Sequence, residues 1–383
     1  MMERTCSSPW HVFPSLPDPV GFGGMFAGVS ENGLFTGGGS RFLGKPPWQG
    51  GIKTFSDRVY LLRTPQGPWR ELDSRLPFPL AHSACTPYQN GVLSVGGVNA
   101  SGPLRDVCHI VVENAAVRWR ALPALPHPIV YGAAAVVSDV LYVVGGVAEA
   151  RSTDPLSTCW ALSLREGSRW TAQPDIPGRA GSVITVGADG ERLYAFGGMA
   201  FLPGSDGTIR PDPLDAAYCY DPGIRTWAPL PSLPEARAGA ASPSARLPDG
   251  RFLVCGGYRF VFPGPPQDHP GFERTTWLYS PEKKEWDEGP PFPYCRAGNL
   301  HGPEPMVTAP AVRWKDWIVL LSGEVRPGRR SPAVLGLTFQ DVCSSIALIR
   351  PRSPSKASIS SISAAPKDTY KTPFLPKTSS VTV

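Results

Sequence analysis

The sequence contains no apolar run long enough to cross a membrane and no apolar segment behind its first residues. A membrane-spanning helix and a secretory signal peptide each require such a segment, so we expect neither. The eight cysteines are scattered, and none of them forms a CxxC pair. Without a secretory signal, this pattern favours reduced cysteines over disulfides. We therefore expect a cytoplasmic protein.

Sequence signatures of several enzyme classes are also missing. There is no GxSxG nucleophile elbow, no HExxH pair and no phosphate-binding P-loop. The histidines do not show the spacing of metal ligands. We therefore expect no metal and no cofactor.

Charge gives little support for a nucleic-acid partner. The formal net charge is only +5, and part of the basic excess lies beyond residue 343, where Asp368 is the single acid. No basic stripe interleaved with aromatic residues occurs. We expect neither nucleic acid nor a membrane as a partner.

Glycine and proline are abundant, and the end of the chain differs from the rest. The 41 glycines and 45 prolines make up more than a fifth of the 383 residues, which predicts many turns and few long helices. Residues 344–383 are rich in Ser, Pro and Lys and have no sustained apolar period. We therefore expect one domain over residues 1–343 and a disordered tail over residues 344–383.

An apolar run that ends in two small residues recurs six times, at intervals of about 50 to 65 residues. The small pair is Gly-Gly in five copies and Ser-Gly in the sixth. Repeats of this length, each with four expected strands, are typical of kelch propeller blades. The sequence therefore predicts an all-β, six-bladed kelch-type β-propeller. The six runs are Leu34–Gly39, Val92–Gly97, Leu141–Gly146, Leu193–Gly198, Phe252–Gly257 and Ile318–Gly323.

A tryptophan followed by a proline-rich turn recurs in step with these runs, and it is expected to wedge between neighbouring blades. The sixth repeat has no such tryptophan, but Trp10 near the N-terminus precedes the same kind of turn. We therefore predict that Trp10–Phe13 forms the outer strand of the sixth blade and closes the ring. The alternative is that residues 1–18 form a loose arm. The five internal tryptophans are Trp69, Trp119, Trp170, Trp227 and Trp286.

Candidate functional residues lie in the loops that should open on one rim of the ring. Glu324 and Arg330 flank a turn at Pro327 and Gly328, on a loop that follows the buried strand of the sixth repeat. By sequence, Arg179, Arg237 and Arg296 occupy equivalent places after the proline-rich turns, and their guanidiniums would attract an anion. The alternative is that each arginine pairs with a local acid. The full set of additional candidates is Arg41, His82, Tyr131, Arg179, Arg237 and Arg296.

Three stretches of the chain resemble the N-acetylneuraminate (sialic acid) mutarotase or epimerase family of kelch propellers. They are residues 26–39, residues 56–61 and, above all, Gly323–Arg330, which matches the family's Gly-Glu-x-x-Pro-Gly-x-Arg loop. The likeness covers about residues 8–341. In bacterial members this loop lies in the middle of the chain, whereas here it lies in the last blade, so the sequence is similar to a cyclically permuted branch. The secreted bacterial enzymes begin with a signal peptide, which this sequence does not show.

The resemblance implies a mutarotase that interconverts the anomers of N-acetylneuraminate or a related carboxylated sugar. It implies that Glu324 shuttles protons, and that Arg330 is a second functional residue, to which we assign the sugar carboxylate or a developing oxyanion. The expected partner is then a small sugar acid, although a protein partner is possible. The alternative function is a non-catalytic kelch module that binds an acidic peptide in the arginine-lined mouth.

The composition of the tail gives a first testable prediction. Truncation after Cys343 should leave the melting temperature and any anomer-exchange activity unchanged, because the removed residues have little apolar side chain to bury. Thermal denaturation of the full-length and truncated proteins measures this directly. A large drop in melting temperature would mean that the tail packs against the propeller.

Overall fold

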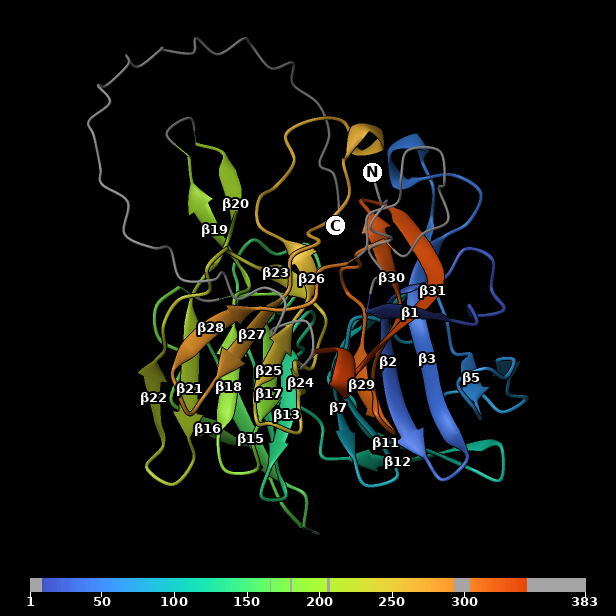
Figure 1. Cartoon of the computed structure of the whole chain (residues 1–383), viewed down its shortest axis with the longest axis horizontal. Coiled ribbons are helices and arrows are strands. Elements are labelled where there is room, and N and C mark those ends of the chain that lie inside the picture. The colour runs from blue at the N-terminus through green and yellow to red at the C-terminus, as the bar shows by residue number, and fades with distance from the viewer. Residues whose placement is uncertain (1–8, 166, 180, 205–206, 293–303, 343–383) are drawn as a thin grey trace, which may run out of the picture.

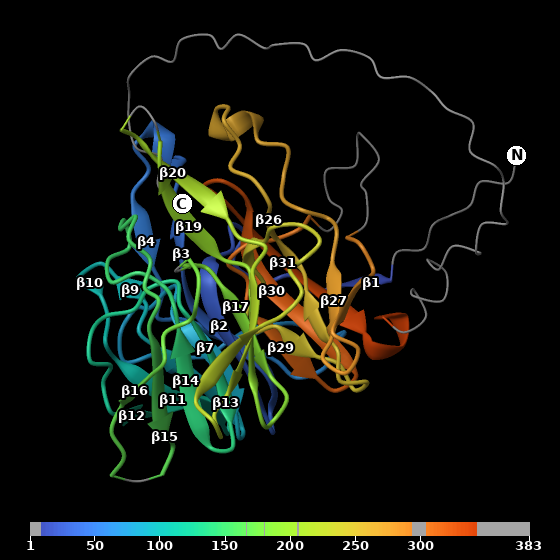
Figure 2. The same cartoon turned by 90° about the vertical axis from the view of Figure 1, so that its left-hand side faces the viewer.

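The structure is a computed structural model, and it describes residues 9–165, 167–179, 181–204, 207–292 and 304–342. Figures 1 and 2 show sheets arranged around a common axis, with the longest loops projecting from one rim. The predicted tail at residues 344–383 lies outside the described residues, and so does Arg296. No helix in the described ranges is long and apolar enough to cross a membrane.

The first three blades are antiparallel four-stranded sheets that follow one another along the chain. Blade 1 contains β2 (Gly23–Ser30), β3 (Gly33–Phe42), β5 (Val59–Leu62) and β6 (Arg70–Glu71). Blade 2 contains β7 (Ala84–Tyr88), β8 (Gly91–Val95), β11 (Val107–Glu113) and β12 (Ala116–Leu122). Blade 3 contains β13 (Ala133–Val137), β14 (Val140–Val144), β15 (Cys159–Ser163) and β16 (Thr171–Gln173).

The remaining three blades repeat this order, but the last one takes its outer strand from the N-terminus. Blade 4 contains β17 (Thr185–Ala188), β18 (Leu193–Phe196), β21 (Ala217–Asp221) and β22 (Thr226–Pro229). Blade 5 contains β24 (Ala245–Arg246), β25 (Phe252–Val254), β27 (Trp277–Ser280) and β28 (Glu285–Glu288). Blade 6 contains β29 (Ala311–Trp314), β30 (Trp317–Arg326), β31 (Arg329–Thr338) and β1 (Trp10–Phe13).

Short strands and 3₁₀ turns lie in the loops between the blade strands. The loop between β18 and β21 is a hairpin, and the loop between β3 and β5 contains a strand that pairs with β3. Two 3₁₀ turns lie in the loops of blades 1 and 5. These elements are β4 (Lys53–Phe55), β9 (Val98–Asn99), β10 (Gly102–Pro103), β19 (Met199–Pro203), β20 (Ile209–Pro213), β23 (Ala238–Ala240), β26 (Gly256–Tyr258), η1 (Pro47–Gln49) and η2 (Pro266–Asp268).

Six hydrophobic clusters lie one at each contact between neighbouring blades, and a seventh, smaller one of Val98, Val130 and Val147 joins blades 2 and 3. β1 contributes to the clusters on both sides of blade 6, because Trp10 packs toward blade 5 and Phe13 packs toward blade 1. Trp10 stacks on Phe292 with ring centroids 4.3 Å apart, and Phe13 meets Trp317 edge-on at 5.2 Å. The predicted ring closure is therefore confirmed, since β1 pairs with β31 along its whole length.

Five of the six tryptophans act in the same way at the blade contacts. Each donates its indole N–H to a proline carbonyl in the outer turn of the preceding blade, at distances of 2.7–3.1 Å. Trp119 is the exception, and the expectation that it wedges between blades is wrong because its surface is 47% exposed. Val117 takes the buried position on the same face of β12, and Trp119 lies two residues further along the strand. The five pairs are Trp10–Pro290, Trp69–Pro14, Trp170–Pro123, Trp227–Pro174 and Trp286–Pro231.

The closing strand offers a test with its own control. Phe13→Ala should lower the free energy of unfolding by about 3–5 kcal/mol, since it removes a buried ring from the contact between blades 6 and 1. Val12→Ala, on the exposed face of the same strand, should change it by less than about 0.5 kcal/mol. Deletion of residues 1–18 should lower the melting temperature strongly. A deletion protein that melts like the full chain would contradict the closure.

Candidate functional site

Six residues with left-handed backbone geometry form a ring where the innermost strands begin. Their φ angles lie between +46° and +70°, and each backbone N–H donates to the carbonyl of the corresponding residue in the preceding blade at 2.8–3.4 Å. These hydrogen bonds form a closed circle around the channel. They also fix which residues in the six blades are structurally equivalent. The ring residues are Gly24, His82, Tyr131, Val183, Gly239 and Thr308.

The ring surrounds a cavity of about 60 Å³, to which all six of its residues contribute. Such a volume can hold water but not a sugar. A ligand as large as a sugar would have to bind above the ring, at the rim that carries the long loops (Figures 1 and 2).

Glu324 and Arg330 face each other across a β-hairpin, which corrects the expectation that they lie on a turn-rich loop. β30 and β31 continue past the predicted strand end, and only Pro327 and Gly328 form the turn, where Gly328 has a φ of +72°. Glu324 and Arg330 are direct cross-strand partners, so their side chains extend from the same face of the hairpin. Both residues are buried, with 2% and 7% exposure.

The Glu324 carboxylate is held by two hydrogen bonds. Its Oε2 accepts from Arg330 Nη1 in a short ion pair, and its Oε1 accepts from the backbone N–H of Gly328 at 2.7 Å. Carboxylates held in this way by a cation and a backbone donor favour the ionised form. The hairpin therefore presents a fixed acceptor group.

Arg330 is packed against blade 1. Its Nε donates to the Ser40 carbonyl at 3.4 Å, and its guanidinium lies 5.7 Å from the centre of the Phe42 ring. A Cβ atom at Gly23 would come within 2.8 Å of Arg330 Nε, so only glycine leaves room for the guanidinium there. Burial lowers the pKa of Arg330 to about 10, against a smaller opposing effect of Tyr131. The guanidinium still carries its charge at neutral pH.

Lys53 is a functional candidate that the sequence reasoning did not name. It lies on β4 directly opposite Phe42 of β3, the residue whose ring contacts Arg330. Burial lowers the pKa of Lys53 to about 8, and the nearby charges of Arg330 and Arg151 act in the same direction. A lysine in a loop gives no sign of its environment until the β3–β4 register is known.

His82 and Tyr131 lie together in the ring, with centroids 4.8 Å apart. His82 Nε2 is 3.1 Å from the Ser40 hydroxyl. Burial holds the pKa of His82 well below its usual value, helped by the charges of Lys53 and Arg330, so its imidazole is neutral. Burial also raises the pKa of Tyr131 and of Tyr258, which follows the glycine pair of blade 5, so both are neutral phenols.

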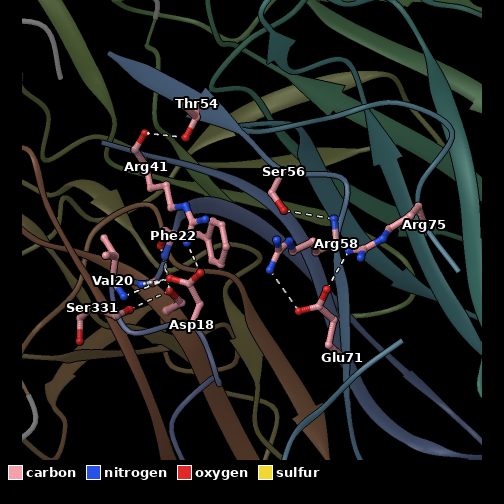
Figure 3. Close-up of polar contacts among 12 residues, drawn as sticks. Asp18, Val20, Phe22, Arg41, Thr54, Ser56, Arg58, Glu71, Arg75 and Ser331 are labelled. Atoms are coloured by element: carbon pink, nitrogen blue, oxygen red, sulfur yellow. Dashed lines mark hydrogen bonds and ion pairs between the residues drawn. The ribbon is translucent and has the colours of Figure 1, made fainter. Parts of the chain in front are cut away.

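The remaining described arginines among the candidates have partners away from this cluster. Arg41 pairs with Asp18 and lies over the Phe22 ring at 4.9 Å, as Figure 3 shows. Arg179 is about half exposed and pairs with Asp212 on β20. Figure 3 shows a similar local network for Arg58, which pairs with Glu71. For Arg41 and Arg179 the structure thus matches the alternative of pairing with a local acid.

Arg237 is inside blade 5, and burial lowers its pKa. Its Nη2 donates to Glu235 Oε2 at 3.0 Å and to Thr275 Oγ1 at 2.9 Å. The predicted equivalence of Arg179 and Arg237 is wrong. The carbonyl of Arg237 accepts from the second glycine of a Gly-Gly pair, and the residue that does so one blade earlier is Gly181. The proline-rich turns differ in length, so counting from them misaligned the blades.

A hollow of about 900 Å³ opens on the rim beside the hairpin. Its walls include Arg330 and Phe42, together with Lys45, Trp48 and Glu304. This volume lies within the range of small-molecule sites, and an aromatic side chain on the wall suits a sugar ring. Glu324 lies behind Arg330 and does not line the hollow itself.

Comparisons with known proteins agree with this architecture. Residues 184–234 and 241–293 each match a family model described as Kelch motif. Similar curated proteins are the N-acetylneuraminate epimerases of Yersinia enterocolitica (29% identity, 55% of this chain and 56% of the relative), Brucella melitensis (29%, 57% and 59%) and Pasteurella multocida (26%, 57% and 59%). The chain thus spans less than two thirds of the length of these relatives.

A solved structure titled "Structure of YjhT" superposes on the chain with a TM-score of 0.59 at 14% identity, covering 84% of this chain and 95% of that one. At this identity the likeness concerns the fold alone. The resemblance inferred from the sequence is nevertheless confirmed by the curated relatives. The chain is a six-bladed kelch-repeat β-propeller, similar over more than half of its length to N-acetylneuraminate epimerases.

Proposed function

We propose that the protein is a mutarotase that interconverts the anomers of N-acetylneuraminate or a related carboxylated sugar. The observation that carries this proposal is the buried Glu324–Arg330 pair, fixed on a hairpin beside the channel and next to a second cation, Lys53. The names of the curated relatives support the same reaction class.

Glu324 is the proton acceptor in this proposal. Its carboxylate has about four lone-pair positions, and Arg330 and Gly328 occupy two of them. A further position can accept the proton of the anomeric hydroxyl. As that proton leaves, the bond between the anomeric carbon and the ring oxygen breaks. Glu324 then passes the proton it has accepted, directly or through water, to the ring oxygen, and so returns to the carboxylate. Rotation and the reverse steps close the ring on the opposite face.

Arg330 has two roles in this scheme. It keeps Glu324 ionised, and it draws a carboxylated sugar to the site, because a guanidinium forms forked hydrogen bonds to carboxylates. Since Glu324 is only 2% exposed, the sugar reaches it when the substrate carboxylate competes for Arg330 and draws the guanidinium aside. A sugar without a carboxylate has no means of doing this, which would restrict the reaction to sugar acids.

Neutral hydrogen-bonding groups surround the cations. His82, Tyr131 and Tyr258 are held uncharged by burial, so they can donate or accept hydrogen bonds without adding charge. Sugar hydroxyls are matched by groups of this kind. We propose that these three side chains bind the hydroxyls of the sugar.

Exposed apolar side chains on the rim favour a second candidate function, the binding of a protein partner. The loops over residues 40–55, 199–215 and 258–274 carry seven large apolar side chains that are more than a third exposed, and such surfaces often mark interaction sites. A partner could bind there with or without catalysis below. These side chains are Leu43, Trp48, Ile52, Leu202, Ile209, Phe260 and Val261.

Substitution of Glu324 tests the catalytic proposal. Glu324→Gln keeps the shape of the side chain but removes the proton acceptor, so anomer exchange should fall by roughly a hundredfold or more while the sugar still binds. Exchange is measured by NMR line shapes or saturation transfer for N-acetylneuraminate and for neutral sugars. Full activity of Glu324→Gln would reject the assignment. Absence of exchange by the unmodified protein on every carboxylated sugar would favour the binding module.

Substitution of Arg330 tests the ion pair separately from catalysis. Arg330→Met should lower the free energy of unfolding at pH 8 by about 3–5 kcal/mol, because it leaves a buried carboxylate unpaired. An unpaired buried carboxyl has a raised pKa, so it can be neutralised as the pH falls and the deficit should shrink toward pH 5. The double variant Glu324→Leu with Arg330→Met should regain most of the loss. Urea denaturation at pH 5 and pH 8 measures the free energies of unfolding. A loss of stability in Arg330→Met that did not depend on pH would contradict this account.

A further inference from the structure

We infer that Lys53 binds the carboxylate of the sugar acid together with Arg330, and that it thereby determines specificity for anionic sugars. The inference rests on the proposed function, because it assigns a partner group to the substrate of that same site. No step of the proton transfer is assigned to Lys53.

The backbone fixes Lys53 at the site. β4 pairs with β3 from Ser40 to Phe42, which places Lys53 opposite Phe42. Phe42 and Ser40 are also the residues that hold Arg330, through its ring contact and its Nε hydrogen bond. The same short segment of β3 therefore positions both cations. In a β-ladder, directly opposed side chains lie on the same face, so Lys53 lies beside the ring that supports Arg330.

The charges around Lys53 suit the binding of an anion. Arg330 of β31 and Arg151 of the loop after β14 interact with it electrostatically, and His82 of the ring is neutral. Among the described residues no carboxylate pairs with Lys53. Glu324 is already held by Arg330 and Gly328, and Asp18 is held by Arg41. A cation cluster of this kind is unfavourable unless an anion joins it.

A structural role for Lys53 does not account for these contacts. A lysine kept for stability would have an acidic partner or an exposed ammonium, whereas this one is partly buried among like charges. Burial lowers the pKa of Lys53 to about 8, and the charges of Arg330 and Arg151 add to this shift. An anion placed between Lys53 and Arg330 would reverse it, so binding should be accompanied by proton uptake.

Isothermal titration calorimetry with N-acetylneuraminate, in buffers of different ionisation enthalpy, tests the inference on the full-length protein. Near pH 8 the unmodified protein should take up about half a proton on binding, and at pH 6 almost none. Its affinity should weaken about tenfold between pH 7 and pH 9, because only about a tenth of the lysine is protonated one pH unit above its pKa. The methyl ester of the sugar should bind weakly and without proton uptake.

Three variants of Lys53 and one control variant separate the alternatives. Lys53→Gln should bind N-acetylneuraminate at least tenfold more weakly and lose the proton uptake, whereas Lys53→Arg should keep most of the affinity but take up no proton at pH 8. Lys283→Gln, at an exposed position in the turn between β27 and β28 and outside the hollow, is the control and should behave like the unmodified protein. Lys53→Met should raise the melting temperature, which a lysine with a structural role would not allow.

Unchanged affinity and proton uptake in Lys53→Gln would overturn the inference even if Glu324→Gln had lost exchange. If the unmodified protein showed the Lys53-dependent binding but no anomer exchange, the inference would stand and the proposed reaction would fall. A lower melting temperature for Lys53→Met, with unchanged binding, would make Lys53 a structural residue.

Discussion

The closed circle of six backbone hydrogen bonds at the start of the innermost strands is the contact on which the geometry of the channel depends. Each bond requires a left-handed residue, and two of the six positions use glycine, which adopts that geometry without strain. Val183 and Thr308 are β-branched and adopt it at a cost on the order of 1–3 kcal/mol each. In return, the innermost strands of all six blades begin at the same level along the channel. His82 and Tyr131 are therefore fixed beneath the rim.

Closure of the ring by the N-terminus has a direct consequence for the site. β1 packs against β31, the strand that carries Arg330, and its Trp10 and Phe13 bury themselves on opposite sides of blade 6. The hairpin that holds Glu324 is therefore part of a blade supported on both sides. A rigid hairpin is what a buried ion pair needs, because its hydrogen bonds compensate for lost hydration only when the geometry is fixed.

At this rim, the arrangement of charges that suits the proposed function is not the one that would be most stable. A protein selected only for stability would pair Lys53 with an acid or replace it with an apolar residue, and it would not place Arg330 in the same cluster. Active sites commonly keep such unfavourable arrangements because a ligand completes them. The lack of an ion-pair partner for Lys53, among the described residues, thus adds to the Glu324–Arg330 pair as an indication of an anion-binding site.

The sequence by itself determined the repeat, the number of blades and the closing strand, because Gly-Gly pairs and tryptophans recur at blade-sized intervals and Trp10 lies outside that order. It also singled out Glu324 and Arg330, since their motif is local. It did not determine which arginines reach the channel, because Arg179 and Arg237 follow turns of different length and only the ring of hydrogen bonds shows their true register. The role of Lys53 was decided by tertiary structure alone. Its surroundings come from Arg330 and Arg151, which are far from it in the chain, and burial among like charges is a property of the folded state that no local pattern records.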